Sequence, residues 1–351
     1  MRAAIMTNWD LRVGDVPDPV PDAGQVLARV LACGICGSDL HMLRFGAELR
    51  ETMADVEAAD PEAPVDPLRP QMFEPHGDCI MGHEFCCEVV DLGPGVSTLR
   101  TGQRVVSLPA AFDGDGVHAV GYSNRYPGGY GELMVLDEDL AIVVEDDVTS
   151  GVAALTEPMA VGVHAVNRSG IGSGDAAIVM GLGPVGLACV AELARRGIGP
   201  IVGADFSPKR RALAGHLGCH EVVDPSDESA IAAWRRVDGS RPLVLFEAVG
   251  MPGMIDQAMR MAPRDSRILV VGVCMPQDHL LPMVGIGREL SIQFVLGYTP
   301  EEFAETHRII TDGSWDLEPL ITGTVDVDGI PQAFDDLGRP DEHAKIIVEP
   351  S

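Results

Sequence analysis

Lysine is almost absent from this chain of 351 residues, which has only Lys209 and Lys345. Arginine carries the remaining positive charge, and 25 basic against 53 acidic residues leave a formal net charge of −28. A protein that binds a nucleic-acid backbone or an anionic membrane surface needs a basic face. The composition therefore argues against both kinds of partner. The acidity suits a highly soluble surface, and a salt-adapted surface is the alternative.

Long apolar runs and a secretion signal are also lacking. No hydrophobic stretch approaches the ~20 residues of a membrane span, although 46% of the residues are hydrophobic. The N-terminal stretch MRAAIMTNWDLRVGD has no apolar core segment and no small-residue cleavage site, so no signal peptide is predicted. We expect a cytoplasmic protein whose eight cysteines are thiols or metal ligands rather than disulfides.

The chain carries two sequence patterns, and its length allows a hydrophobic core for each. Residues 1–150 read as short β-segments broken by glycine and proline, among them QVLARVLAC and FCCEVVDLG. From about Gly174, apolar strands alternate with helical stretches, beginning with AAIVMGLG and PVGLACVAELARRG. This alternation predicts βαβ units in a doubly wound parallel sheet. The pattern ends near Tyr298, and we expect the tail to return to the first domain.

Residues 46–78 fit neither pattern, because they are acidic, rich in proline and contain methionine. A surface loop is the ordinary expectation for a long segment of this kind. The alternative is a lid or a pocket wall, to which Met53, Met72 and Phe73 would contribute apolar contacts.

A glycine-rich turn follows the first apolar strand of the second half. Gly181, Gly183 and Gly186 fit the pattern G-x-G-x-x-G, with Pro184 and Val185 between the last two glycines. Such a turn lets the backbone approach a pyrophosphate at a helix N-terminus, and proline is favoured in the first turn of a helix. The sequence therefore predicts a dinucleotide site.

An acidic residue, Asp205, ends the second strand, 19 residues after Gly186. At this distance a carboxylate accepts hydrogen bonds from the adenine ribose, and its charge repels a 2′-phosphate. We therefore predict NAD rather than NADP. Arg210 can support the same ribose, or bind a 2′-phosphate if Asp205 turns away. The alternative role for Asp205 is to cap the helix that starts at Ser207.

The segment CGICGSDLH contains two cysteines three positions apart, Cys33 and Cys36. No thioredoxin-like strand–helix unit surrounds them, which argues against a redox pair. A structural zinc clip needs a second close pair with suitable spacing, whereas Cys86 and Cys87 are adjacent. The remaining possibility is a catalytic metal site with three protein ligands and one open position.

Such a ligand set is available from Cys36, His83 and a carboxylate of either Glu84 or Glu157. A thiolate, an imidazole and a carboxylate together suit zinc. Zinc lowers the pKa of a coordinated alcohol, and the alkoxide can then lose hydride to a nicotinamide. The predicted metal site would ionise the alcohol and the predicted nucleotide site would supply the hydride acceptor, so the two predictions support each other.

The alcohol proton must also leave the site. Ser38 and His41 are three residues apart, close to Cys36, and share one face if the stretch is helical. Ser38 can take the proton and pass it through the ribose to His41, whose pKa suits a shuttle. The alternative for His41 is an ordinary exposed helix residue.

The motifs GxCGSDLH, GHE, TEPMAVGVHA and GLGPVG occur in this order, with an acid at the end of the second strand. Together they resemble the medium-chain zinc-dependent alcohol dehydrogenases, in particular the sorbitol/threonine dehydrogenase-like branch. The resemblance covers nearly the whole chain. It implies an α/β protein with a GroES-like β-rich catalytic domain over residues 1–155 and 299–351, interrupted by the insertion 46–78. It also implies a Rossmann NAD-binding domain over residues 156–298.

The resemblance assigns roles to individual residues. Cys36 and His83 match zinc ligands, and Glu84 or Glu157 matches a third ligand or a group behind the zinc-bound water. Ser38 and His41 match the proton relay, and Cys33 matches a residue that is not a ligand. The further cofactor contacts that the resemblance implies are Gly250, Val271, Gly272, Val273, Leu296, Gly297 and Lys345.

Two departures from the family pattern change the expectations. Many relatives hold a second, structural zinc with four closely spaced cysteines after the GHE segment, but residues 91–130 contain no cysteine. We therefore predict one zinc per chain. The 47-residue spacing from Cys36 to His83 is unusually long, so we expect the insertion to lie near the substrate cleft and to change specificity.

The expected substrate is a small-molecule alcohol, either a secondary alcohol or a polyol. The apolar segment LSIQFVLGY suits a strand that extends a sheet across a two-fold axis, in a homodimer or homotetramer. One rival function is a zinc-free NAD(P)H quinone or enone reductase of the same superfold. Loss of activity on addition of a chelator would exclude it. The other is a non-catalytic nucleotide-binding protein, and any measured turnover would exclude that function.

Overall fold

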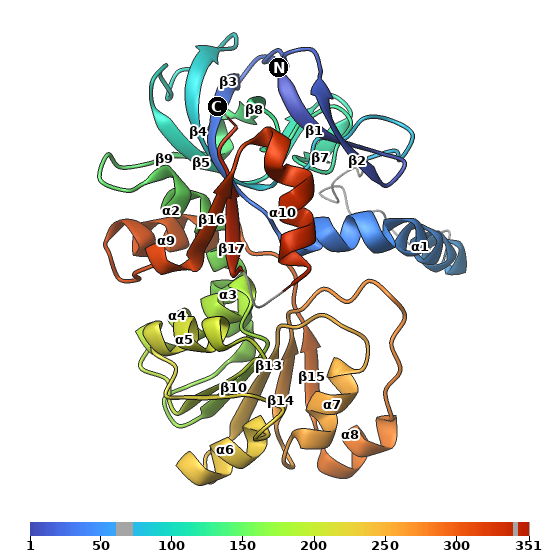
Figure 1. Cartoon of the computed structure of the whole chain (residues 1–351), viewed down its shortest axis with the longest axis vertical. Coiled ribbons are helices and arrows are strands. Elements are labelled where there is room, and N and C mark those ends of the chain that lie inside the picture. Colours follow the sequence, from blue (N-terminus) through green and yellow to red (C-terminus); the bar gives the residue numbers. More distant parts are fainter. Residues whose placement is uncertain (61–72, 340–342, 351) are drawn as a thin grey trace. The chain divides into compact units, whose positions relative to one another are not determined.

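The computed structural model describes residues 1–60, 73–339 and 343–350. The described chain folds into two compact units (Figure 1). The first comprises Met1–Glu157, Ile321–Arg339 and Lys345–Ser351, and the second is built on Pro158–Leu320. The chain passes from the first unit into the second near the start of helix α3, Thr156–Ser169.

The first unit is rich in β-structure, as its short apolar segments predict. Its main sheet has the strand order β16-β17-β3-β4-β5-β9, and β8 pairs with β3. Alternate residues of β3 and β4, including Val26, Val30, Phe85 and Val89, are buried in its core. The bounds of its strands are β1 Arg2–Thr7, β2 Asp10–Asp15, β3 Gln25–Gly34, β4 Glu84–Leu92, β5 Arg104–Ser107, β6 Ala110–Asp113, β7 Gly116–Ala119, β8 Leu133–Asp137, β9 Ala141–Val143, β16 Ile321–Val325 and β17 Lys345–Val348, and those of its helices are α1 Gly37–Ala59, α2 Ser150–Ala154 and α10 Ile330–Leu337.

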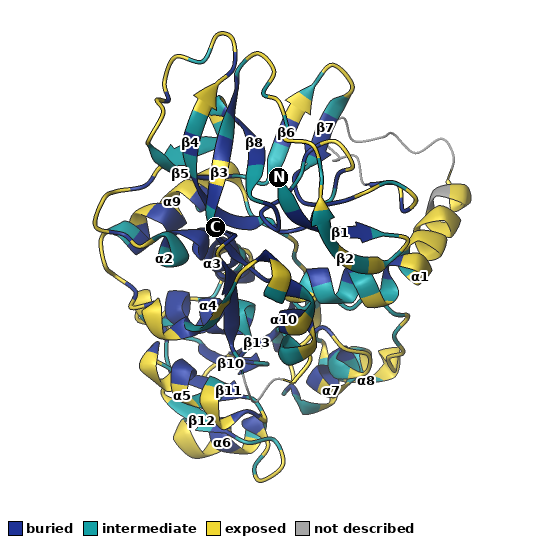
Figure 2. Cartoon of the chain, turned by 45° about the horizontal axis from the view of Figure 1, so that its top comes forward, coloured by how far each residue is buried: buried dark blue, intermediate teal, exposed yellow. Residues whose placement is uncertain are grey.

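The second unit is a six-stranded parallel sheet with the order β12-β11-β10-β13-β14-β15. Strands β10 and β13 are buried along their whole length (Figure 2), which is typical of a sheet covered by helices on both faces. Helices α6 and α7 pack on one face through Trp234 and Met259. The bounds are β10 Ala176–Met180, α4 Pro184–Arg195, β11 Ile201–Ala204, α5 Pro208–His216, β12 Glu221–Val223, α6 Ala230–Val237, β13 Leu243–Glu247, α7 Met254–Met261, β14 Arg267–Val270, α8 Pro282–Arg288, β15 Ser291–Phe294 and α9 Pro300–Thr311.

The boundary after the parallel sheet falls at Leu320, whereas the sequence placed residues 299–351 with the first domain. Helix α9 belongs to the second unit because its Glu302 accepts a hydrogen bond from Asn167 on α3 at 2.6 Å and lies 2.7 Å from His164. The Trp315 indole also donates to the Ala191 carbonyl at 3.3 Å. Among the described residues after Leu320, strands β16 and β17 and helix α10 return to the first unit.

The segment 46–78 is not simply a loop, because residues up to Ala59 continue helix α1. The outer turns of α1 are exposed (Figure 2), and Met53 is among the exposed residues. Phe73 is buried, with its ring centroid 5.5 Å from that of Trp9. Met72 lies outside the described residues, and a role of this segment as a lid stays a prediction.

Within the described ranges, no helix combines the length and the apolar character that crossing a membrane requires.

Candidate functional site

Cys36 is the N-cap residue of helix α1, two residues after the end of strand β3. Its backbone N–H donates to the Asp39 carboxylate at 3.3 Å, so the third residue of the helix reaches back to the cap. This local structure fixes where the Cys36 side chain leaves the backbone. The first turn of the same helix carries Ser38, and His41 follows in the next turn.

Three metal-binding side chains meet beside this helix terminus. Cys36, His83 and Glu84 each offer a ligand atom, and these atoms lie within 4.8 Å of one another. Ligands around a tetrahedral zinc stand roughly 3.5 Å apart, so a small adjustment of side chains would place all three on one ion. A thiolate, an imidazole and a carboxylate fit zinc and leave a fourth position for another ligand.

The His83 ring is oriented by a buried carboxylate. Its Nδ1 lies 3.5 Å from Asp39 Oδ1, which leaves Nε2 as the nitrogen available to a metal. Burial lowers the pKa of His83, but the negative charges of Asp39 and Cys36 outweigh burial and raise the pKa well above its usual value. The site is therefore electronegative and favours a cation.

Glu84, at the start of β4, is paired with one of the two lysines of the chain. Lys345 Nζ donates to Glu84 at 2.8 Å and 2.5 Å, and to the Ile35 carbonyl at 3.0 Å. Burial lowers the pKa of Lys345, but Glu84 and then Cys36 more than offset it, so the pKa is raised. The resemblance implied a cofactor contact for Lys345, whereas here its three donors are engaged by Glu84 and Ile35 within the first unit.

The other predicted residues of this site lie as follows. Glu157 is buried in the first turn of α3 and is not part of the three-residue ligand group. Ser38 Oγ lies 3.1 Å from the Tyr122 hydroxyl, and the His41 ring lies 6.0 Å from that of Phe45. Cys33 is a buried free thiol outside the ligand group.

All eight cysteines are free, as expected from the sequence. Of the two cysteines in the CGIC segment, the ligand group contains Cys36 alone.

The second unit presents the glycine-rich turn between β10 and α4. Gly181 has φ +85°, and a Cβ on Gly186 would lie 1.9 Å from the Gly181 carbonyl oxygen, so both positions require glycine. Gly183 is the N-cap of α4, and Pro184 and Val185 begin the helix. These glycines give the turn before α4 the backbone conformation of the fingerprint, and a phosphate at this helix N-terminus stays a prediction.

Asp205 follows β11 beside this turn. Its carboxylate accepts from the Leu182 N–H and from the Ser207 N–H, each at 2.8 Å. Arg210 Nη1 lies 4.0 Å from the same carboxylate. Asp205 thus forms hydrogen bonds both to the glycine-rich turn and to the start of α5. Each carboxylate oxygen can still accept a further hydrogen bond.

The remaining predicted cofactor residues follow three other strands at the same edge of the sheet. Gly250 follows β13, and the resemblance-based contacts after β14 and β15 are Val271, Gly272, Val273, Leu296 and Gly297. The carboxyl ends of parallel strands share one edge, which is where open α/β sheets bind ligands. The strand order reverses between β10 and β13, so this edge has a topological switch point.

A buried carboxylate that the sequence did not predict also lies at this edge. Glu247 Oε1 accepts from the Val249 and Gly250 N–H groups at 2.7 and 3.0 Å, and its backbone carbonyl accepts from Val271 and Gly272. Glu247 thereby ties together the loops after β13 and β14. Its position at the last residue of an apolar strand is the signal that could have revealed it.

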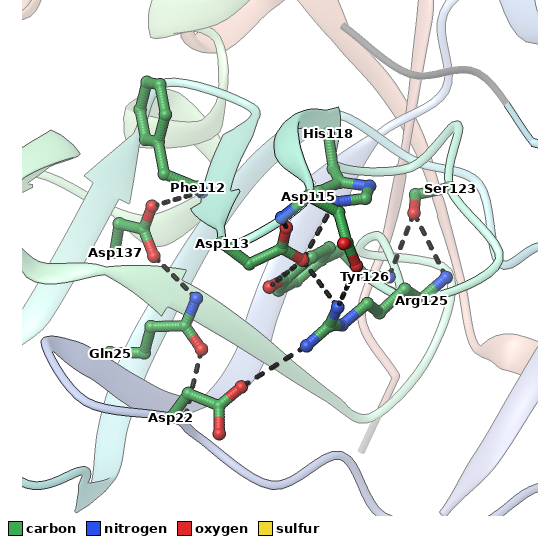
Figure 3. Close-up of polar contacts among 10 residues, drawn as sticks. All are labelled: Asp22, Gln25, Phe112, Asp113, Asp115, His118, Ser123, Arg125, Tyr126 and Asp137. Carbon is green, nitrogen blue, oxygen red and sulfur yellow. Dashed lines mark hydrogen bonds and ion pairs between the residues drawn. The ribbon is translucent and has the colours of Figure 1, made fainter.

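A polar cluster occupies the cysteine-free region after β5 (Figure 3). Asp113 Oδ2 lies 2.8 Å from both His118 Nε2 and Arg125 Nη1, and it accepts from the Tyr126 hydroxyl at 3.1 Å. The Asp115 N–H donates to Asp113 Oδ1 at 2.8 Å. Hydrogen bonds around one buried carboxylate therefore hold the β6–β7 hairpin to the loop that follows it.

This cluster makes stability depend on pH. Burial raises the pKa of Asp113, but hydrogen bonds from the Asp115 amide, His118 and Tyr126 outweigh it and lower the pKa to about 2. A carboxylate with a lowered pKa stabilises the fold above its unfolded pKa of ~3.9, and this stabilisation disappears as pH falls toward 2. We expect Asp113→Asn to cost about 1–2 kcal/mol at pH 7 and little at pH 2.

Urea unfolding of both chains from pH 7 to pH 2 measures this difference. The two curves should converge as the pH falls. A constant gap between Asp113→Asn and the unmodified chain would contradict the assignment of Asp113 as the titrating group.

The fold and the two sites define a class of protein. A donor set suited to zinc lies in a β-rich unit, and a dinucleotide fingerprint lies in a doubly wound α/β unit. Metal-assisted oxidoreductases that use a nicotinamide combine these two parts.

Comparison with known proteins agrees with this class. Residues 22–146 match the family described as alcohol dehydrogenase GroES-like domain, and residues 184–312 match the family described as zinc-binding dehydrogenase. The chain is 30% identical to the (R,R)-butanediol dehydrogenase of Bacillus subtilis and 25% identical to the sorbitol dehydrogenase of the same organism. The alignments cover 100% of this chain and 100% and 98% of those relatives.

A solved structure shows the same architecture. The crystal structure of 2R,3R-butanediol dehydrogenase from Bacillus subtilis superposes with a TM-score of 0.79 at 27% identity, covering 100% of this chain and 99% of that one. The chain therefore belongs to the medium-chain zinc-dependent alcohol dehydrogenase family, in its sorbitol dehydrogenase-like branch. The GroES-like and Rossmann-type parts expected from the sequence are confirmed.

Proposed function

We propose that this enzyme oxidises a secondary alcohol or polyol to the ketone with NAD, and catalyses the reverse reaction. The observation that carries the proposal is the Cys36, His83 and Glu84 ligand group beside the start of α1. The names of the relatives, butanediol and sorbitol dehydrogenases, support the substrate class. When bound, zinc lowers the pKa of the alcohol, and NAD accepts the hydride.

The residues around the zinc and NAD have separate roles. Cys36 and His83 hold the metal, with a third ligand from Glu84 or Glu157. Glu84 has the distance in its favour, and Lys345 holds it in place. Ser38 takes the alcohol proton and His41, on the same helix, passes it toward solvent.

The test is NADH formation by the purified chain with primary alcohols, secondary alcohols and polyols, with and without a chelator. The proposal predicts turnover of a secondary alcohol or polyol that the chelator abolishes and added zinc restores. Turnover that resists the chelator would favour the zinc-free reductase. No turnover across the panel, with NAD still bound, would favour the non-catalytic nucleotide-binding protein.

The position of Asp205 supports a preference for NAD over NADP, because a second negative charge beside it is unfavourable. We expect Asp205→Asn to remove the charge while keeping one of the two acceptor oxygens. The ratio of kcat/KM for NAD to that for NADP should fall ~10–100-fold. Initial rates with both cofactors measure this ratio. The control is Asp224→Asn, which removes an acidic partner of Arg211, and an equal shift in that variant would contradict the assignment.

A second copy of this chain is the proposed partner of strand β15, which ends the parallel sheet. Edge strands with apolar surface favour pairing with another chain. Large apolar side chains on and around this strand and α8 are exposed, namely Met283 at 65%, Ile286 at 68%, Phe294 at 67% and Leu296 at 84%. These exposures support a homodimer, or a tetramer built from it.

We expect Ile286→Glu to convert this oligomer to monomer, because it places a charge in the proposed interface. Sedimentation velocity at micromolar concentration measures the mass. Val20→Glu is the matched control, since Val20 is 81% exposed in the first unit. An unmodified chain that sediments as a monomer would contradict the proposal.

The eight free thiols support a reducing compartment, and we propose the cytoplasm.

A further inference from the structure

Tyr122 lies where the loop after β7 meets the start of helix α1. Its hydroxyl is 3.1 Å from Ser38 Oγ and donates to Asp39 Oδ1 at 2.5 Å. Its ring centroid lies 5.4 Å from that of His83. Tyr122 therefore touches the predicted proton acceptor, the carboxylate that orients the metal ligand, and the ligand itself.

Counting protons fixes the direction of these hydrogen bonds. Asp39 also receives the Tyr130 hydroxyl at 2.6 Å and the Cys36 N–H at 3.3 Å, so its carboxylate acts as an acceptor for several donors. A phenol has one proton, and the shorter contact assigns it to Asp39. The Tyr122 oxygen can then only accept from Ser38, so the Ser38 hydroxyl donates to Tyr122.

This direction has a consequence for Ser38. A hydroxyl whose single proton points at Tyr122 has only acceptor lone pairs left for any other partner. An alcohol that approaches Ser38 must therefore donate its own proton in the hydrogen bond. That polarity is the one that alcohol oxidation needs, and without Tyr122 the Ser38 hydroxyl could rotate and offer its proton instead.

We propose that Tyr122 is a positioning residue, which holds the Ser38 hydroxyl as a hydrogen-bond acceptor for the alcohol. The inference rests on the proposed function, in which Ser38 takes the alcohol proton. The hydrogen bond to Tyr122 orients Ser38 before transfer; as Ser38 takes the alcohol proton it releases its own proton toward His41, and no bond to hydrogen breaks at Tyr122.

Tyr130 supplies a matched control. Its hydroxyl also donates to Asp39, through Oδ2 instead of Oδ1, but Ser38 has its hydrogen bond to Tyr122. Tyr122→Phe and Tyr130→Phe each remove one phenol donor from the same carboxylate. A difference between them isolates the contact with Ser38.

The experiment is a pair of double-mutant cycles, Ser38→Ala with Tyr122→Phe and Ser38→Ala with Tyr130→Phe. We expect Tyr122→Phe alone to lower kcat/KM for the alcohol ~10-fold, with the KM for NAD within about twofold. In the Ser38→Ala background, Tyr122→Phe should cost less than about twofold. Tyr130→Phe should have the same effect in both backgrounds.

A second readout does not depend on activity. The Ser38–Tyr122 hydrogen bond should appear as a coupling in the unfolding of the metal-free chain, where the Tyr130 cycle shows none. Equal losses from Tyr122→Phe in both backgrounds, with no coupling in unfolding, would overturn the proposal. A Ser38→Ala chain with unchanged turnover would instead overturn the proposed function on which it rests.

Discussion

Replacing Cys36 or His83 with alanine is expected to remove the bound zinc and to lower kcat ~10³-fold or more. Each change deletes one of the three ligand atoms that lie within 4.8 Å of one another. A site with only two protein ligands binds zinc weakly. Without zinc, the negative charge that develops on the alcohol oxygen loses several kcal/mol of stabilisation. Elemental analysis of the purified variants gives zinc per chain, and NADH formation gives kcat.

Cys33→Ala is the control for this prediction. Cys33 belongs to the same CGIC segment and is a buried free thiol, but it lies outside the ligand group. The Cys33→Ala chain should keep its zinc and most of its turnover. Loss of zinc from Cys33→Ala, or full zinc in Cys36→Ala, would show that the ligand has been assigned to the wrong cysteine.

Removing the Lys345 ammonium should cause a large loss of stability in the first unit. Glu84 and Lys345 are both buried and form a close ion pair. Deleting one partner leaves the other charge buried without compensation, which costs ~3–5 kcal/mol. We expect this loss in the metal-free Lys345→Met chain, as measured by urea unfolding.

Two further variants make this prediction specific. Glu84→Gln combined with Lys345→Met should recover most of the lost stability, because it removes both charges from the interior. Arg236→Met breaks an exposed pair with Glu221 and Glu228 and should cost less than ~1 kcal/mol. A Lys345→Met chain as stable as Arg236→Met would contradict the view that the Glu84 charge depends on Lys345.

Most of the second unit, up to the end of its parallel sheet, could be predicted from the sequence. Each strand is a short apolar run, most helices follow within a few residues, and the glycine-rich turn has a backbone requirement that Gly181 and Gly186 meet locally. Parallel strands then bring the predicted cofactor residues to one edge without any further information. The Asp205 position also follows from spacing along the chain.

The metal site was predictable in part. Cys36 and His83 have few alternatives once a catalytic site is considered, but Glu84 and Glu157 have equal chemistry, and only the folded chain places one of them in the ligand group. The Lys345 contact could not be foreseen, because 261 positions separate it from Glu84. Sheet pairing of β17 with β3, and of β3 with β4, brings the two together.

Other features depend on tertiary contacts that carry no local signal. Tyr122 lies in an irregular loop, 84 positions from Ser38, and no motif marks it. Helix α9 stays with the second unit because of Glu302 and Trp315, which are ordinary residues in the sequence. Helix α1 extends through Ala59 into a segment whose composition suggested a loop.

The most direct test of the central claim is a titration of the metal-free enzyme with zinc, with NADH formation from a secondary alcohol or polyol followed at each addition. We expect no turnover without zinc, a linear rise, and a plateau at one zinc per chain. Full turnover in the metal-free chain would contradict the zinc-dependent mechanism. A plateau at two zinc ions per chain would contradict the assignment of a single site built on Cys36 and His83.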